Sequence, residues 1–206
     1  MSHGMVVVGL TGSIGMGKTT AADMLRALGL PVFDADAAVH ALQSPGGAAL
    51  PAIATAFPGL VREGVLDREA MAERVFKDPE SLRKLEEIVH PLVRAEEQRF
   101  LRNAGLRGAD LAVLEIPLLF ESGGERRCDY TIVVTAPSFL QKARVLKRPG
   151  MTEERLHGVL AKQTPDAEKR KRADFIVPTG MGRYHTLNAL REIVRLIRRR
   201  KTKPRK

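Results

Sequence analysis

Residues 12–19 of this 206-residue chain, Gly-Ser-Ile-Gly-Met-Gly-Lys-Thr, fit the pattern G-x-x-x-x-G-K-[ST]. In this pattern the backbone N–H groups of a glycine-rich loop surround phosphate oxygens, the lysine reaches the β- and γ-phosphates, and the hydroxyl ligates Mg²⁺. We therefore expect Lys18 to contact phosphates and Thr19 to hold Mg²⁺. The residues predicted to bind a nucleotide here are Gly12, Ser13, Ile14, Gly15, Met16, Gly17, Lys18, Thr19 and Thr20.

The segments on either side of this phosphate loop suit such a site. The apolar run 6–10 predicts a strand before the loop, and residues 20–28 predict a helix after it. A helix that begins at the loop adds its partial positive charge to the site. The alternative is a chance match at a tight turn, and the order strand, loop, helix argues against it.

Two carboxylates, Asp34 and Asp36, follow the second predicted strand at 30–33. Ligands collect at the carboxyl ends of parallel strands, so we expect these acids near the phosphate loop. If the segment is extended, the two side chains share a face. One carboxylate then contacts a substrate hydroxyl or Mg²⁺. The alternative is that one of them only caps the helix predicted at 37–42, and the two roles are compatible.

A helical region is predicted from Asp67 to Leu101, with Asp67 as a cap and a second start at Pro79. No element is assigned to the Pro-, Gly- and Ala-rich stretch before it. The dipeptide His90-Pro91 predicts a kink or a new helix, because proline lacks the N–H that a helix needs. A histidine on a helix usually has a structural role or faces solvent. At a break and near Arg94, a ligand contact is the other interpretation of His90.

A basic helical segment at 141–165 follows the strands predicted at 111–115 and 130–134. Arg144 and Arg148 are four residues apart, so on a helix they share a face. Such a segment is typical of a lid that brings arginines over phosphates. The alternative is a solvated surface helix, the more common place for such charges. A short strand at 175–177 and an amphipathic helix at 187–197 complete the predicted fold.

The composition is typical of a globular α/β protein, with 44% hydrophobic and 28% charged residues. No apolar run is long enough to cross a membrane and the N-terminus lacks the features of a signal peptide, so we expect a cytoplasmic protein without a membrane partner. The single cysteine, Cys128, agrees with a reducing compartment.

Most of the net charge of +10 lies near the C-terminus, where residues 191–206 carry nine Lys or Arg and one Glu. We expect residues 198–206 to be a frayed, solvated basic tail. Without interleaved aromatic residues to stack bases, this tail predicts no specific nucleic-acid partner.

The loop alone indicates a nucleoside triphosphate and leaves the class of protein open. Regulatory GTPases need an Asn-Lys-x-Asp segment, and neither Asn103 nor Asn188 precedes a lysine. A phosphate loop, an acid pair and an arginine-bearing lid together suit a small-molecule kinase. Two alternatives are open: a kinase for a nucleoside monophosphate or a sugar, and an NTP-binding module that docks RNA or a protein through the basic tail.

Five stretches, in order and at matching spacing, resemble the dephospho-coenzyme A kinase family. They are 9–19, 33–36 (F-D-A-D), 90–94 (H-P-L-V-R), 117–121 (P-L-L-F-E), and a lid with its following helix made of 144–148, 152–163, 168–169 and 173–174. The likeness runs from about residue 6 to residue 180. The chain departs from the family pattern at Ser13, where a glycine is usual, and at Pro178-Thr179, where an asparagine is common.

The resemblance implies a three-layer α/β P-loop NTPase fold with a parallel sheet, and ATP and Mg²⁺ as cofactors. It also implies phosphorylation of the ribose 3′-hydroxyl of dephospho-CoA, the last step of CoA biosynthesis. The sequence does not determine the oligomeric state, and a monomer is the expectation. Asp36, Lys18 and Arg144 are the implied catalytic residues, and Arg148 adds to the ATP site. The implied substrate-binding residues are Asp34, Asp36, His90, Arg94, Pro117 and Leu118.

The expected organisation is one kinase domain over 5–206. Its core is predicted at 5–60, 105–140 and 170–200, with a helical substrate region at 61–104 and the lid at 141–165.

Overall fold

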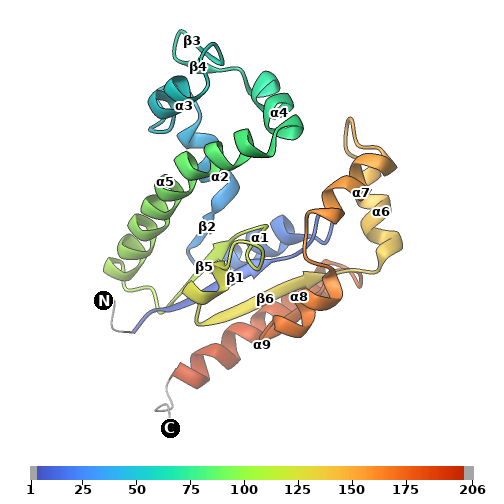
Figure 1. Cartoon of the computed structure of the whole chain (residues 1–206). Helices are drawn as coiled ribbons and strands as arrows, with labels where there is room; N and C mark the ends of the chain where they lie inside the picture. Colours follow the sequence, from blue (N-terminus) through green and yellow to red (C-terminus); the bar gives the residue numbers. More distant parts are fainter. Residues whose placement is uncertain (1–3, 202–206) are drawn as a thin grey trace. The chain divides into compact units, whose positions relative to one another are not determined.

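The computed structural model describes residues 4–201 (Figure 1). The chain divides into two compact units. The first combines the segment up to Phe33 with the segment from Asn103 onward, and the second is Asp34–Arg102. The phosphate loop lies in the first unit. Each unit has its own hydrophobic cluster and is described by itself.

A five-stranded sheet organises the first unit, in the order β2-β5-β1-β6-β7. The strands are β1 (Val6–Thr11), β2 (Val32–Asp34), β5 (Leu111–Glu115), β6 (Tyr130–Thr135) and β7 (Phe175–Pro178). β1 pairs in parallel with β5 and β6, and β6 pairs in parallel with β7. Parallel strands bring their carboxyl ends to one edge, so the residues after β1, β5, β6 and β7 meet there. The predicted α/β class with a parallel sheet is confirmed.

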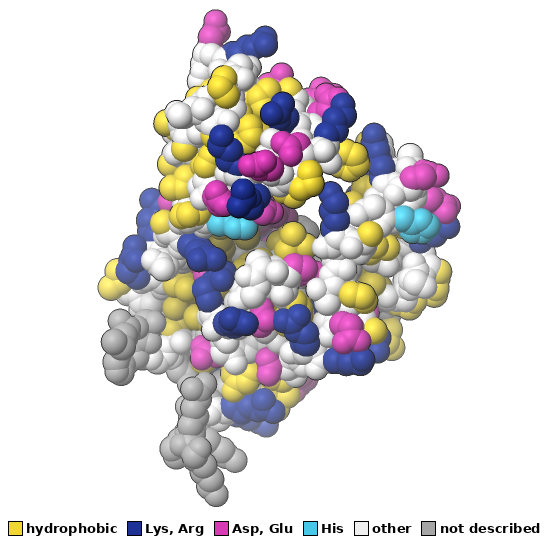
Figure 2. Space-filling view, viewed as in Figure 1, with side chains coloured by type: hydrophobic (Ala, Val, Ile, Leu, Met, Phe, Trp, Pro, Cys, Tyr) yellow, Lys and Arg dark blue, Asp and Glu magenta, His cyan; other side chains and the backbone are white. Residues whose placement is uncertain are grey.

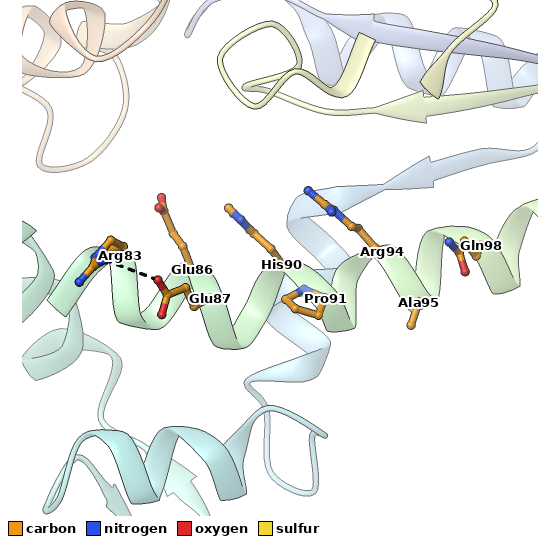
Figure 3. A pocket seen from close by; sticks show the side chains of 8 residues that line it. All are labelled: Arg83, Glu86, Glu87, His90, Pro91, Arg94, Ala95 and Gln98. Atoms are coloured by element: carbon orange, nitrogen blue, oxygen red, sulfur yellow. Dashed lines mark ion pairs between the residues drawn. The ribbon is translucent and has the colours of Figure 1, made fainter. Parts of the chain in front are cut away.

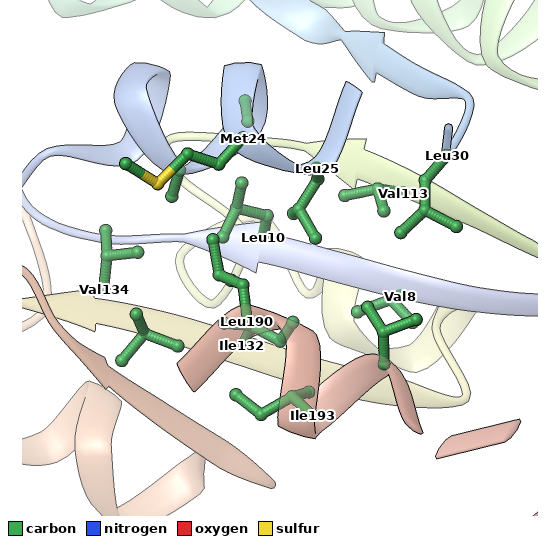
Figure 4. Packing of buried hydrophobic residues seen from close by; sticks show 14 of the residues in the cluster. Val8, Leu10, Met24, Leu25, Leu30, Val113, Ile132, Val134, Leu190 and Ile193 are labelled. Atoms are coloured by element: carbon green, nitrogen blue, oxygen red, sulfur yellow. The ribbon is translucent and has the colours of Figure 1, made fainter. Parts of the chain in front are cut away.

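Two helices, α1 (Lys18–Ala27) and α9 (Arg183–Lys201), cover one face of this sheet. Val8 and Leu10 alternate with their neighbours along β1 and therefore point to the same face. They pack with Leu25 of α1 and Leu190 of α9, all buried (Figure 4). The periodicity of the sequence thus places α1 directly behind the phosphate loop.

The opposite face of β1 is covered closely by the segment after β5. A Cβ added to Gly9 would lie 2.8 Å from Leu119 Cδ2 and 2.9 Å from Cys128 Sγ. A larger residue would require the Leu119 and Cys128 side chains to shift, and glycine avoids this. The remaining helices of this unit are α6 (Ser138–Leu146), α7 (Glu153–Ala161), α8 (Asp166–Arg172) and the 3₁₀ helix η1 (Gly124–Arg127).

The second unit is mostly helical. Its elements are α2 (Ala35–Leu42), α3 (Leu50–Ala56), β3 (Val61–Arg62), β4 (Val65–Leu66), α4 (Arg68–Lys77) and α5 (Pro79–Leu106), and α5 continues into the first unit. Asp67 accepts the Ala70 N–H at 3.0 Å, which confirms the predicted cap. The β3–β4 hairpin turns at Glu63 and Gly64, which both have positive φ, as a type I′ turn requires. Neither this hairpin nor α3 was predicted.

Two local predictions need correction. Of the two outcomes expected at Pro91, a kink or a new helix, the new helix does not occur, because α5 runs for 28 residues through Pro91. One missing N–H is tolerated because the other turns keep their bonds and the buried side of the helix holds it in place. The segment Asp34–Asp36 is also not extended throughout, because α2 begins at Ala35. The argument that both carboxylates share a strand face therefore fails.

The predicted frayed end is also wrong for the residues described. Helix α9 continues to Lys201, and the guanidinium of Arg198 donates two hydrogen bonds to Asp110, at 2.7 and 3.1 Å. The Arg200 guanidinium lies over the rings of Tyr130 and Phe175. Residues 202–206 of the predicted tail lie outside the described part of the chain.

Charge on the visible surface is mixed in sign. Figure 2 shows Lys and Arg side chains spread over this face and interspersed with Asp and Glu. Among residues 4–201, no helix combines the length and the apolar character needed to cross a bilayer.

Candidate active site

The geometry of the phosphate loop requires glycine at three of its positions. A Cβ on Gly12 would lie 2.4 Å from Val134 Cγ2 and 2.7 Å from the Val134 carbonyl oxygen. Gly15 and Gly17 have φ of +76° and +88°, a region that side chains disfavour. The pattern of glycines in the sequence is therefore explained by one contact with β6 and two left-handed residues.

Side chains from distant parts of the chain bind the carbonyl oxygens of three successive loop residues. The three contacts are Gln141 Nε2 to Ile14 O at 2.8 Å, Arg144 Nη1 to Gly15 O at 3.4 Å, and Thr179 Oγ1 to Met16 O at 2.7 Å. Gly17 caps α1 without a side chain, so the N–H groups of the first turn are available to an anion. Three carbonyl oxygens of the loop thus accept hydrogen bonds from side chains, and the N–H groups of the first turn of α1 can bind phosphate oxygens.

Lys18 forms an ion pair with Glu115, the last residue of β5, at 2.8 Å. Glu115 is 1% exposed and pairs in register with Leu10, just before the phosphate loop. The Arg26 guanidinium lies 3.4 Å from its other oxygen. In the sequence, Glu115 is the last residue of the strand predicted at 111–115. The structure shows it to be the carboxylate that holds the phosphate-loop lysine.

The two arginines predicted to act together have different surroundings. Arg144 donates to Thr179 Oγ1 at 3.1 Å and to the Thr179 carbonyl at 2.8 Å, so it lies against the phosphate loop. Arg148 is exposed and lies beyond α6, which ends at Leu146. The prediction that both share one helix face is therefore wrong.

Thr179, which stands in the sequence where the family pattern commonly has an asparagine, binds the phosphate loop. Its hydroxyl binds the Met16 carbonyl and accepts from Arg144, and its N–H donates to the Thr135 carbonyl at 2.8 Å. It therefore joins the phosphate loop to the ends of β6 and β7. No spacing in the sequence signals this role.

The loop after β5 packs against the end of β1. Thr11 Oγ1 donates to the Pro117 carbonyl at 2.9 Å, and Leu118 is 44% exposed next to the buried Leu119. Pro117 and Leu118, two of the predicted substrate residues, are thus close to the start of the phosphate loop along the sheet edge. These contacts lie within the first unit.

Glu121, at the end of the same loop, forms an ion pair with the fully buried Lys169 at 3.0 Å. It also accepts the Thr164 N–H at 2.7 Å. Burial raises the pKa of the Glu121 carboxyl, but the hydrogen bonds from Lys169 and Thr164 outweigh it, so the net pKa lies below the ordinary value. The carboxylate is therefore charged near neutral pH.

Within the second unit, the two aspartates have separate positions. Asp34 Oδ1 accepts the Ala37 N–H at 2.9 Å and caps α2, which confirms the capping interpretation for this residue. Asp36 is exposed in the first turn of α2, two residues beyond the end of β2. Asp34 thus caps α2, whereas Asp36 is an exposed residue of its first turn.

A groove of about 580 Å³ follows α5 and includes both predicted residues of that helix, His90 and Arg94. Together with Glu86 they are spaced four residues apart and project from one side of the helix (Figure 3). Both His90 and Arg94 are exposed. The continuous helix, rather than a break at Pro91, is what aligns them.

Comparison with known proteins identifies the family. A family model described as dephospho-CoA kinase matches residues 6–181. The chain belongs to the dephospho-CoA kinase family. A curated family member from Paramagnetospirillum magneticum is 58% identical over 194 residues, which cover 94% of this chain and 92% of that protein.

Two solved structures resemble this member of the family over most of its length. A protein from Thermus thermophilus aligns with a TM-score of 0.84 and 38% identity, covering 94% of this chain and 98% of that one. The dephospho-CoA kinase from Campylobacter jejuni aligns with a TM-score of 0.68 and 26% identity, covering 93% and 96%. Membership of this enzyme family confirms the resemblance seen in the sequence and favours a kinase over an NTP-binding module.

Proposed function

We propose that this chain transfers the γ-phosphoryl group of ATP to the ribose 3′-hydroxyl of dephospho-CoA, giving CoA and ADP. The observation that carries this proposal is the family match over residues 6–181, which includes an intact phosphate loop. The reaction needs two aligned substrates and a site that neutralises charge on the transferring group. The phosphate loop suits the nucleotide, and the predicted substrate residues of α2, α5 and the loop after β5 suit the acceptor.

The phosphate loop and Lys18 bind the β- and γ-phosphates, and residues 12–20 form the nucleotide site. Lys18 must leave Glu115 at least in part, because the same ammonium group serves both anions. Thr19 is exposed in the first turn of α1, and a hydroxyl oxygen is a ligand that suits Mg²⁺. Mg²⁺ held there would neutralise charge on the transferring phosphoryl group.

Asp36 orients the attacking hydroxyl and accepts its proton late in the transfer. An exposed aspartate is a weak base, so orientation is the larger contribution. Asp36 is exposed in the first turn of α2, which begins directly after the end of β2. Asp34 supports it by fixing the first turn of α2 through the bond to Ala37.

Arg144 stabilises negative charge near the phosphate loop, with Arg148 in support from the exposed turn that follows α6. Because Arg144 also holds Gly15 and Thr179, replacing it by alanine should lower both turnover and stability. A lid formed by the segment 141–165 would exclude water, which competes as a phosphoryl acceptor.

His90 and Arg94 contact the anionic part of dephospho-CoA, whose diphosphate matches two cationic or hydrogen-bonding side chains on one helix face. Pro117 and Leu118 supply apolar contact from the loop after β5. These roles rest on the alignment of the side chains on α5 and on the exposure of Leu118.

The test is release of ADP with dephospho-CoA as acceptor, with and without Mg²⁺, beside a panel of nucleoside monophosphates and sugars. We expect stoichiometric ADP only with dephospho-CoA and Mg²⁺. Asp36→Asn should keep ATP binding and lower kcat by orders of magnitude. The control Asp23→Asn, on the exposed side of α1, should leave kcat close to wild type. Turnover of another acceptor in preference to dephospho-CoA would refute the proposal.

A further inference from the structure

Two glutamine side chains bind the backbone carbonyl and the backbone N–H of Ile14 in the phosphate loop. Gln141 Nε2 donates to the Ile14 carbonyl at 2.8 Å, and the Ile14 N–H donates to Gln163 Oε1 at 3.1 Å. Gln141 belongs to α6, and Gln163 lies two residues beyond the end of α7. The contacts therefore come from opposite ends of the segment 141–163, and both end on Ile14.

The side-chain types match this geometry. A carboxamide offers both a donor and an acceptor, so one glutamine can bind a carbonyl and another an N–H. A glutamate at 141 could not donate to Ile14, and a lysine at 163 could not accept from it. Gln141 is 7% exposed, so its amide has little access to water as a substitute partner.

The backbone next to Gln163 is fixed by a second set of contacts. Thr164 donates its N–H to Glu121 Oε1 at 2.7 Å, and the Lys169 ammonium lies 3.0 Å from the same oxygen. Lys169 is 0% exposed and carries the charge that balances Glu121. Pro165 restricts the backbone of the residue before it. Gln163 therefore reaches Ile14 from a turn whose backbone is held by Glu121.

The contacts between α6 and α7 include an exposed ion pair. Lys142 and Glu153 are 2.9 Å apart, and their side chains are 51% and 55% exposed. Such a pair contributes little to holding a segment in place. Because this ion pair holds α7 only weakly, the hydrogen bond from the Ile14 N–H to Gln163 is the more specific contact at the end of α7, and it joins α7 to the phosphate loop.

We infer that Gln163 is a positioning residue, which couples α7 to the phosphate loop through the Ile14 amide. Nucleotide bound in the loop restricts the Ile14 backbone further, and the hydrogen bond from the Ile14 N–H passes that restriction to Gln163 and the end of α7. The catalytic consequence rests on the proposed function. The coupling itself needs only nucleotide binding.

The test compares Gln163→Met, which removes the acceptor at similar size, with Gln163→Glu, which keeps an acceptor oxygen. Gln43→Met, at the end of α2, is the matched control. Hydrogen exchange of residues 153–164 is measured with and without ADP and Mg²⁺, together with kcat, the KM for ATP and the urea unfolding midpoint.

In the wild type and in Gln43→Met, we expect ADP to slow hydrogen exchange across 153–164. In Gln163→Met this response should be lost, and kcat should fall about two- to twelvefold, the effect of one neutral hydrogen bond. Gln163→Glu should regain the exchange response, while its negative charge near the phosphates raises the KM for ATP.

An unchanged ADP response in Gln163→Met would overturn the inference. It would also be overturned if exchange quickened over the whole chain in parallel with a lower unfolding midpoint, because that is a general loss of stability. If the wild type responds to ADP and fails to phosphorylate dephospho-CoA, the proposed function fails and the coupling stands.

Discussion

Replacing Lys18 by methionine should destabilise the fold as well as abolish turnover. Glu115 is 1% exposed and would lose the cation that lies 2.8 Å away. Removing one partner of a buried pair typically costs about 3–5 kcal/mol, because a charge is left buried. Here the Arg26 guanidinium, 3.4 Å from the other oxygen, and the 14% exposure of the lysine side chain reduce that cost. We expect a loss of about 2–3 kcal/mol.

Urea unfolding measures this loss, with ADP release measured in parallel. With a urea dependence of about 1–3 kcal/mol per molar, the midpoint should fall by roughly 1 M. Lys77→Met is the matched control, because its pair with Glu73 is exposed and worth at most about 1 kcal/mol. The double variant Lys18→Met/Glu115→Gln should regain most of the stability and none of the turnover. A midpoint for Lys18→Met equal to that of Lys77→Met would refute the reasoning.

Three further outcomes are expected. Gly12→Ala should lower the unfolding free energy by a few kcal/mol and turnover with it, since its Cβ would lie 2.4 Å from Val134; an unchanged urea midpoint would contradict this. Asp34→Ala should cost about 1 kcal/mol in urea unfolding by removing the α2 cap, with Asp34→Asn close to wild type. The pKa of Glu121 is lowered, so its pairing stabilises the fold above the unfolded-state pKa, near 4.5, and that stability is lost as pH falls through the lower folded-state pKa. Below about pH 4.5 the unfolding free energy of the wild type should therefore decline more steeply than that of Glu121→Gln/Lys169→Met.

The sheet and the helices packed on it were predictable because their sequence patterns are local and periodic. The apolar runs of β1, β5 and β6 appear in the sequence at nearly the bounds that the structure has. The hairpin of β3 and β4 was not predicted, since two-residue strands carry almost no periodic signal. At Pro91 the local rule for proline was overridden by the surrounding helix.

The site was predictable where one residue type in one motif determines the chemistry. The glycines, Lys18 and the Asp34 cap are of this kind. The partners of the loop carbonyls were not, because no motif marks Gln141 or Thr179 as a ligand of a distant backbone. The pairing of Glu115 with Lys18 depends on the register of β5 with β1, which the sequence does not display.

The shape of the phosphate loop is therefore a property of the whole first unit. Gln141 is 127 residues from Ile14 along the chain, and Thr179 is 163 residues from Met16. Glycines allow the loop to adopt this shape. Because glycines also allow many other conformations, they do not favour this one. The preference comes from side chains that reach the loop only after β6 and β7 have joined the sheet. It follows that a peptide with β1, the loop and α1 alone would contain the complete motif and would bind phosphate poorly, which isothermal titration with ADP can measure.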